Sequence, residues 1–358
     1  MTRLDRYIGL SVLGAMALVL LVLGGLDLLF TGLEQIGETD AQYRTRDALI
    51  YVLHIFPRHI YEMLPLTALI GALAGLGALA SSNELVAFQA AGVPRVRIVA
   101  AVMKPAVLVM ALGFVLGEYV APPLEVRGEV HKALATGSEV ALSRYGHWER
   151  DGNAFLHFNA IEPEGILHGV SIFNFDEQQR MVRRVSAERA VYHSDDGGWQ
   201  LEQGTETLFD YSAAVVASSH TPFEQQALRL DLTPELLQVL LVDPDKMSVS
   251  DLYRYAQRFE RQGQDADDYY LSFWKKVLQP LTTAVLVLLA ISFIFGPLRE
   301  ATMGSRVFTA ICFGLGFTIV QRLLHSVSLV YQFEPLVAVL LPILLCALLG
   351  LALLRRAA

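Results

Sequence analysis

The chain has 358 residues, of which 53% are hydrophobic and 18% are charged, and its mean hydropathy is +0.42. A soluble globular domain carries about 25% charged residues, so this composition predicts membrane spans joined to one aqueous domain and excludes a disordered chain. The net charge of −8 argues against a nucleic-acid partner, and both cysteines, Cys312 and Cys346, lie in apolar runs that exclude a disulfide framework.

The first part of the chain contains three long apolar runs. A bilayer core of about 30 Å requires about 20 apolar residues in a helix, and the runs at about 8–33, 51–80 and 98–120 meet this requirement. The first run is too long for a signal peptide, and Asp27 is its only charge. We therefore expect three transmembrane helices in residues 1–122.

A polar segment, 123–268, follows the third run. Short alternating or β-rich stretches recur in it, separated by turn residues, at 154–161, 169–175, 187–193, 199–202, 206–209 and 228–232. This spacing predicts an antiparallel sandwich or jelly roll. A connecting helix should then begin at Ser248 or Ser250 and end near Gly263.

Three more apolar runs, at about 273–295, 307–324 and 336–354, complete a third part at 269–358. Six spans in a 3+3 arrangement place both termini on one side of the membrane. The basic residues of that side are Arg3, Arg6, Arg95, Arg97, Arg299, Arg306, Arg355 and Arg356. The positive-inside rule makes this side cytoplasmic and puts the polar segment on the opposite side.

Motifs for chemistry are missing from the sequence. It contains no GxxxxGK[ST], HExxH or GxSxG pattern, so we expect no catalytic, metal or cofactor site in this chain. Two GxxxG pairs, Gly71/Gly75 and Gly113/Gly117, predict close packing of helices.

The fifth apolar run ends in a polar face. Thr318, Gln321, Arg322 and His325 are spaced so that they share one side of a helix. Such a face suits a water-accessible cavity or anionic lipid headgroups, because charges inside a membrane are costly. An arginine that extends to the membrane interface explains the pattern equally well.

The loop between the second and third runs predicts a short helix at about 82–92. Ser82 or Asn83 can cap it, Glu84 suits its positive end, and Gly92 with Pro94 ends it. Two interpretations remain open: a helix that docks into a cytosolic motor, or a helical turn that rests on the membrane surface.

Three segments resemble a known family. LDRYIG at 4–9, NELVAFQAAG at 83–92 and SFIFGPLR at 292–299 are similar to the lipopolysaccharide export permeases LptF and LptG, and the first and third favour the G subunit. The resemblance implies a multi-pass permease of the Gram-negative inner membrane with an inserted periplasmic β-jelly roll. Such a subunit extracts lipopolysaccharide from the outer leaflet and passes it to a periplasmic bridge toward the outer membrane.

The resemblance also implies partners. These are an LptF permease, two copies of the LptB ATPase, which carry ATP and Mg, LptC, and indirectly LptA; this chain itself is not an enzyme. The residues expected to couple to the ATPase are Glu84, Leu85, Phe88, Gln89, Gly92 and Arg95.

In this family the first and fifth spans line the lipopolysaccharide cavity and its gates. The residues expected there are Asp27, Phe30, Glu34, Arg44, Arg46, Thr318, Gln321, Arg322 and His325. Some G subunits carry lysines at the outer end of the first span, but this chain is acidic there, so we expect arginines, or divalent cations bridged by acidic residues, to contact lipid A phosphates. A small-solute transporter and a mechanotransmitting subunit that moves no lipid are the alternatives.

Overall fold

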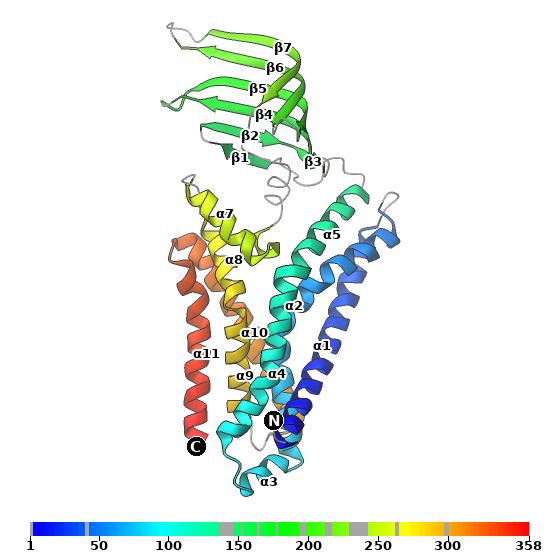
Figure 1. Ribbon diagram of the computed structural model, residues 1–358, viewed down its shortest axis with the longest axis vertical. Coiled ribbons are helices and arrows are strands. Elements are labelled where there is room, and N and C mark those ends of the chain that lie inside the picture. Colours follow the sequence, from blue (N-terminus) through cyan, green and yellow to red (C-terminus); the bar gives the residue numbers. More distant parts are fainter. Residues whose placement is uncertain are drawn as a thin grey trace. The chain divides into compact units, whose positions relative to one another are not determined.

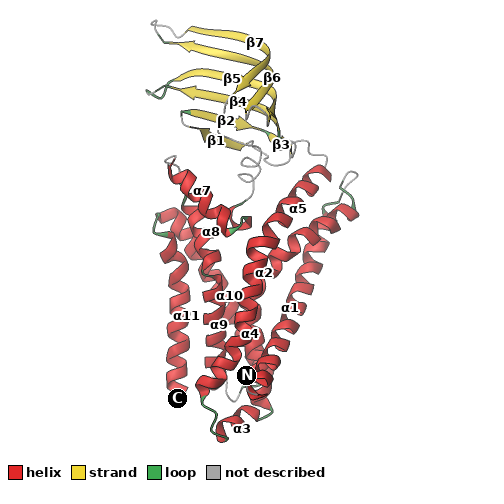
Figure 2. Cartoon of the chain, viewed as in Figure 1, coloured by secondary structure: helices red, strands yellow, loops and turns green. Residues whose placement is uncertain are grey.

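A computed structural model describes residues 3–39, 43–135, 147–151, 153–162, 165–176, 178–193, 198–211, 217–228, 243–261, 265–296 and 301–357. The chain divides into two compact units (Figures 1 and 2). Unit 1 comprises Met1–Gly37, Val52–Glu125 and Pro244–Ala358, and unit 2 comprises Glu38–Tyr51 and Val126–Asp243. The boundaries at 122 and 268 that the sequence suggested stay a prediction.

The helices before the sheet follow the apolar runs. They are α1 (Arg3–Gly37), α2 (Thr45–Ser81), α3 (Glu84–Ala90), α4 (Arg95–Val115), the π-helical turn η1 (Leu116–Val120) and α5 (Ala121–Ala135). The π-helical turn has a cause in the sequence, because Pro122 and Pro123 have no N–H to donate to the carbonyl groups four residues earlier. The third span therefore changes its hydrogen-bond register just before these prolines.

The second half contains the other helices that the structure describes. They are the 3₁₀ turn η2 (Pro244–Lys246), α7 (Val249–Arg261), α8 (Asp267–Val277), α9 (Gln279–Phe295), α10 (Met303–Tyr331) and α11 (Pro335–Ala357). The connecting helix is confirmed as α7, and the Ser248 Oγ caps it by accepting from Asp251 N at 3.1 Å. Arg299 lies outside the described residues.

Among the residues that the structure describes, the six predicted spans correspond to five long apolar helices and one bent pair. α8 and α9 are long and apolar enough to cross a membrane only when taken together, and they meet at an angle of 49°. Pro280 stands at the start of α9, where it cannot continue the hydrogen-bond ladder of α8. The fifth span also runs further than expected, because α10 continues through Arg322 and His325 to Tyr331.

Close helix packing in unit 1 occurs at the GxxxG glycines. A Cβ on Gly71 would lie 2.5 Å from the Met16 Cα, and one on Gly75 would lie 2.8 Å from the Val12 Cα. The backbones of α1 and α2 can therefore approach only because these side chains are hydrogen atoms. The prediction of helix packing from these glycines is confirmed within this chain.

Unit 2 contains the β domain. Its strands are β1 (His147–Asp151), β2 (Ala154–Phe158), β3 (Ala160–Glu162), β4 (Ile166–Phe175), β5 (Met181–His193), β6 (Gly198–Asp210) and β7 (Ala217–Leu228). They form one antiparallel seven-stranded sheet in the order β1-β2-β4-β5-β6-β7, with β3 paired to β4. The register sets Ile172 opposite Val185 and Trp199 opposite Leu228.

The antiparallel domain that the sequence predicted is confirmed, but its described strands are not arranged as a two-sheet sandwich. Apart from β3, which pairs with β4, the strands follow one another in chain order, and the sheet is strongly curved (Figure 1). The alternating pattern of apolar and polar residues shows that one face of each strand is buried. It does not show which part of the protein covers that face, so it cannot tell a sandwich from one curved sheet. The expected run at 228–232 lies, apart from Leu228, outside the described residues.

The curved sheet is apolar on one face. Phe158, Ile172 and Trp199 are almost fully buried in a cluster with leucines and valines of β2, β4, β5 and β6. At other positions of the same strands, ion pairs join neighbouring strands. One of them links Arg183 of β5 to Glu206 of β6 at 2.5 Å. The strands therefore alternate between an apolar and a polar surface.

Candidate functional site

The short helix α3 is present between α2 and α4, with Glu84 as its first residue. Asn83 occupies the N-cap with a left-handed backbone at φ 60°, and its side chain makes no capping bond. The Ser82 Oγ instead donates to the Glu84 Oε1 at 2.9 Å. Gly92, at φ 80°, follows the helix where a left-handed residue is required.

The two sides of α3 differ from the arrangement that the sequence suggested. Leu85 is only 4% exposed and packs into the helical core of unit 1, with Phe88 partly buried beside it. Val86, Ala87 and Ala90 are exposed instead. The side chain of Leu85 is therefore used to attach α3 to the bundle, and its expected role in coupling to an ATPase stays a prediction.

The other residues expected to couple to an ATPase include Glu84, Gln89 and Arg95, which lie in α3 or at the start of α4. The Tyr7 hydroxyl donates a hydrogen bond to the Glu84 side chain, which ties α3 to α1. Gln89 is half-buried, and the Arg95 guanidinium lies 5.9 Å from the centre of the Phe295 ring. Figure 1 shows α3 and both chain termini at the same end of unit 1.

The expected residues of the first span differ in their surroundings. Phe30 is 68% exposed and Glu34 is exposed, whereas Asp27 is held by His59 of α2 at 2.6 Å. Arg44 and Arg46 are exposed residues of unit 2.

The polar face of α10, in contrast, lines a cavity. Thr318, Gln321, Arg322 and His325 all contribute to a cavity of about 470 Å³ within unit 1. The other walls come from α2, η2, α8, α9 and α11. Of the two interpretations left open, the structure supports a cavity-lining face.

Five charged residues of this cavity were missed in the sequence-based set. They are Arg58, Glu62, Asp245, Lys275 and Lys276. Arg58 and Glu62 are four residues apart in the outer half of the second span, and two lysines stand together at the start of the fourth. Both features are visible in the sequence, but only the fold brings them to α10.

Most charges around the cavity are already paired. The Arg58 guanidinium lies 2.9 Å from Glu62 and 3.1 Å from the buried Glu125. Lys275 lies 3.1 Å from Asp245, and His325 lies 3.2 Å from Asp268. Arg322 makes no hydrogen bond or ion pair with any residue that the structure describes.

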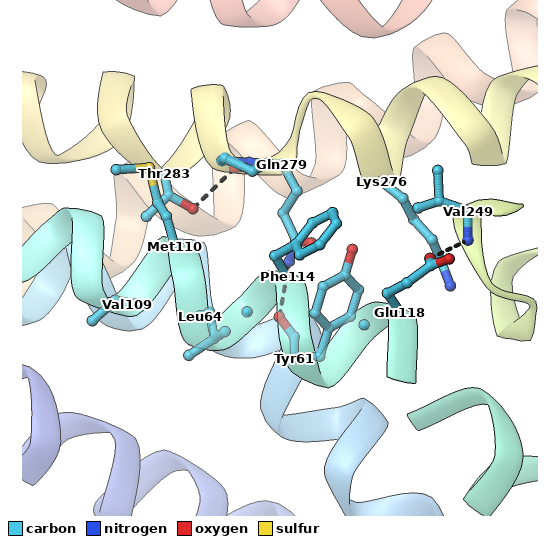
Figure 3. Close-up of a pocket in the computed structure, with 13 residues that line it drawn as sticks. Tyr61, Leu64, Val109, Met110, Phe114, Glu118, Val249, Lys276, Gln279 and Thr283 are labelled. Atoms are coloured by element: carbon cyan, nitrogen blue, oxygen red, sulfur yellow. Dashed lines mark hydrogen bonds between the residues drawn. The ribbon is translucent and has the colours of Figure 1, made fainter. Parts of the chain in front are cut away.

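A tightly packed junction adjoins the cavity where the α8–α9 bend meets α2 and η1 (Figure 3). Gln279 Nε2 donates to the Tyr61 carbonyl oxygen at 2.9 Å. Across the junction, the Glu118 carboxylate accepts from the backbone N–H groups of Val249 and Ser250, at 2.7 and 3.3 Å. A carboxylate at the first turn of a helix also interacts favourably with the helix dipole, so Glu118 fixes the start of α7.

α1 and α10 are the least buried apolar helices. In the most apolar window of each, 17% of residues are buried, compared with 67% in α2. Among their exposed side chains are Leu21, Phe30, Leu33, Phe308, Leu323 and Val330. Both helices therefore offer long apolar surfaces to lipid or to another membrane protein.

The comparisons with known proteins agree along the whole chain. Residues 6–356 match the family model described as the lipopolysaccharide export system permease LptF/LptG. The chain belongs to the LptF/LptG family. It is similar to the lipopolysaccharide export system permease protein LptG of Escherichia coli strain K12, with 35% identity over 99% of this chain and 98% of the relative. It is equally similar to the LptG of Haemophilus influenzae, with 35% identity over 96% of this chain and 95% of that protein.

Membership in the LptF/LptG family fits the observed architecture. The long apolar helices and the full-length match identify a multi-pass membrane protein with an inserted β domain. The resemblance drawn from the three sequence segments is confirmed, including its preference for the G subunit, since the relatives from both organisms are LptG proteins.

Proposed function

We propose that the chain is a permease subunit of an ABC transporter that extracts lipopolysaccharide from the outer leaflet of the inner membrane. It passes the lipid to a periplasmic β bridge and is driven by a separate cytosolic ATPase. The observation that carries this proposal is the similarity over 98% of the length of a protein named as a lipopolysaccharide export permease. The similarity includes the helices, the short α3 among them, and the β domain.

The exposed apolar surfaces support this function. Extraction from the bilayer costs about 0.8 kcal/mol for each buried CH₂ group, so the acyl chains of a glycolipid must stay shielded from water. α1 and α10 supply apolar surface along the membrane part, and the buried cluster of the curved sheet supplies an apolar face in the β domain. We assign the gate facing the lipid to α1 and α10, with Phe30 on its surface.

We propose that α3 receives the motion of the motor. Leu85 and Phe88 anchor it to the bundle, and Val86, Ala87 and Ala90 are free to contact a partner. A rigid helix anchored on one face transmits a force better than a flexible loop. The partners in this assembly are an LptF permease, two LptB ATPase subunits that bind ATP and Mg, LptC and, through the bridge, LptA.

The orientation follows from charge. Arg3 and Arg6 are exposed at the end of unit 1 that carries α3 and both termini. The positive-inside rule makes this end cytoplasmic, so we place the β domain in the periplasm. Accessibility of a cysteine introduced at Ser218 to a membrane-impermeant maleimide in whole cells tests this placement, with a cysteine at Ala87 as the matched inaccessible position.

Reconstitution tests the function. Proteoliposomes containing the chain with LptF, LptB and LptC should transfer lipopolysaccharide to added LptA only when ATP is present. Omission of this chain should abolish the transfer. Nucleotide hydrolysis without transfer by a complete, lipopolysaccharide-loaded complex would contradict the proposal and favour a mechanotransmitting subunit.

A further inference from the structure

Arg306 is a buried cation in the first turn of α10. Only 3% of its surface is exposed, although it belongs to the set of basic residues that orient the chain. Arg3, Arg6 and Arg97 of the same set are exposed. A long basic side chain near the end of a membrane helix usually extends to water. The positive-inside rule therefore does not explain why Arg306 is buried.

The guanidinium group of Arg306 binds the end of α2. Its Nη1 donates a buried hydrogen bond to the carbonyl oxygen of Gly77 at 2.7 Å. Gly77 lies about one turn before Ser81, the last residue of α2, where the negative end of the helix dipole also favours a cation. Burial of an arginine costs free energy unless its N–H groups find acceptors. This hydrogen bond therefore holds the first turn of α10 against the last turns of α2.

The two helices fit closely at this point. A Cβ on Gly77 would lie 3.2 Å from the Cδ of Arg306 and 3.2 Å from the Sδ of Met303. The missing side chain of Gly77 therefore makes room for the arginine. A Cβ on Gly314 of α10 would likewise clash with Leu66 of α2, so the same two helices meet again further along.

The attachment of α10 to the bundle is narrow. Its buried residues Arg306, Ala310, Gly314 and Phe317 recur every three or four positions and so form one face of the helix. Most of its other surface is exposed, because only 17% of its most apolar window is buried. Arg306 is the charged member of this face, and its hydrogen bond gives the contact with α2 a defined geometry.

The same end of α2 also carries α3. The chain leaves α2 at Ser81 and begins α3 at Glu84. Leu85 of α3 is 4% exposed and belongs to the same buried cluster as Leu76 and Leu79 of α2. A displacement of α3 therefore also displaces the end of α2 to which Arg306 is bound.

We propose that Arg306 is a positioning residue that couples α3 to α10. A motor that displaces α3 moves the end of α2, and the hydrogen bond from Arg306 to Gly77 passes this movement to the start of α10. This inference deepens the proposed function and rests on its assignment of α10 to the gate that faces the lipid. It names the residue through which the gate helix follows the motor.

The ratio of lipopolysaccharide release to ATP hydrolysis tests this role in proteoliposomes containing LptF, LptB and LptC, with LptA added. Arg306→Met keeps a long side chain but removes every N–H donor. Its release per hydrolysed ATP should fall about tenfold, within the range by which coupled sites affect one another, while LptB retention and ATP hydrolysis stay close to those of the unmodified complex. Arg306→Lys should recover part of the ratio, because it keeps a charged donor. Gly77→Ala disturbs the same contact from α2 and should also lower the ratio.

Two control variants separate coupling from general destabilisation. Ser328→Ala removes another buried hydrogen bond of α10, from the Ser328 Oγ to the Phe333 carbonyl oxygen at 2.8 Å. Arg254→Ala removes an arginine from an exposed position of α7. Both should release as much lipopolysaccharide per ATP as the unmodified complex. An unchanged ratio in Arg306→Met, or an equal loss in Ser328→Ala, would overturn the proposal.

A second readout needs no lipid transfer. Cys312 of α10 is exposed, and Cys346 of α11 is partly buried. Trapping LptB with ATP and vanadate should change the rate at which N-ethylmaleimide alkylates Cys312 relative to Cys346, and this response should be lost in Arg306→Met. A response that persists in Arg306→Met, or that is missing from the unmodified complex, would contradict the coupling. A complex that shows the predicted response but releases no lipopolysaccharide would contradict the proposed function and support the role of Arg306.

Discussion

Nδ1 of His59 lies 2.6 Å from Oδ2 of Asp27 and joins α2 to α1 in a largely apolar part of unit 1. Both side chains are about one-quarter exposed or less. Asp27 is therefore engaged by its own chain, and the one charge in the apolar first run has a structural partner. A charge at membrane depth that is paired in this way does not require a ligand.

This pair predicts a measurable coupling between two helices. Asp27→Ala and His59→Ala should each lower the stability of the chain in nanodiscs by about 1 kcal/mol, because each removes one hydrogen-bonding partner. The double variant should lose less than the sum of the two. Thermal unfolding of all four proteins gives the double-mutant cycle, and strict additivity would show that the contact contributes nothing.

The contact between α1 and α2 predicts a second effect. Gly71→Ala should destabilise the chain by about 1–3 kcal/mol, because the new Cβ would lie 2.5 Å from the Met16 backbone. Gly14→Ala is the matched control, since a Cβ there meets nothing within 4 Å. It should be neutral or stabilising, given the higher helix propensity of alanine. The melting temperatures of both variants in detergent measure the difference. Equal values would contradict the close approach of the α1 and α2 backbones at Gly71.

The ion pair of Asp245 with Lys275 should make the stability of the cavity wall depend on pH. Burial on its own raises the pKa of this carboxyl, but the ammonium of Lys275 and the nearby His325 and Ser272 outweigh burial, so the pKa lies below the ordinary value of 3.8. A carboxyl group whose pKa is lower in the folded chain than in the unfolded chain stabilises the fold at pH values above its unfolded-state pKa. This stabilisation is lost as the pH falls through the folded-state pKa.

The pair of Asp245 with Lys275 should therefore be unchanged between pH 7 and pH 5 and break only below about pH 4. The difference in melting temperature between the unmodified chain and Asp245→Asn measures this. It should be constant from pH 7 to pH 5 and shrink below that window. A difference that disappears already at pH 6 would exclude Asp245 as the titrating group.

Local features of the fold were predictable from the sequence. Apolar runs located the long helices, and the spacing of Gly71 and Gly75 predicted close packing, because both follow from the chemistry of neighbouring residues. The periodicity of Gln321, Arg322 and His325 indicated a polar face, but the cavity that this face lines is visible only in the fold. The bend at Pro280 was harder to predict, because the apolar run continues through it and only the proline marks it.

Long-range contacts were not predictable in the same way. Arg58 and Lys275 reach the cavity from helices that are far apart in the sequence, and no local pattern reports which helices become neighbours. The burial of Leu85 has a related reason, because an apolar face of a short helix is used as readily for attachment to its own bundle as for a partner. Likewise, alternation in the strands indicated an antiparallel domain but not its single curved sheet.

The exposed face of α3 carries the central claim, which is that an external ATPase drives lipid extraction through this helix. The most direct measurement compares the unmodified chain with Val86→Glu in proteoliposomes containing LptF, LptB and LptC. Val86 is 49% exposed, so the substitution leaves the bundle intact but buries an unpaired charge in any docked interface. LptB retention and ATP-dependent lipopolysaccharide release should both fall at least tenfold, while Arg254→Ala behaves like the unmodified chain. Full LptB binding and full release by Val86→Glu would contradict the claim.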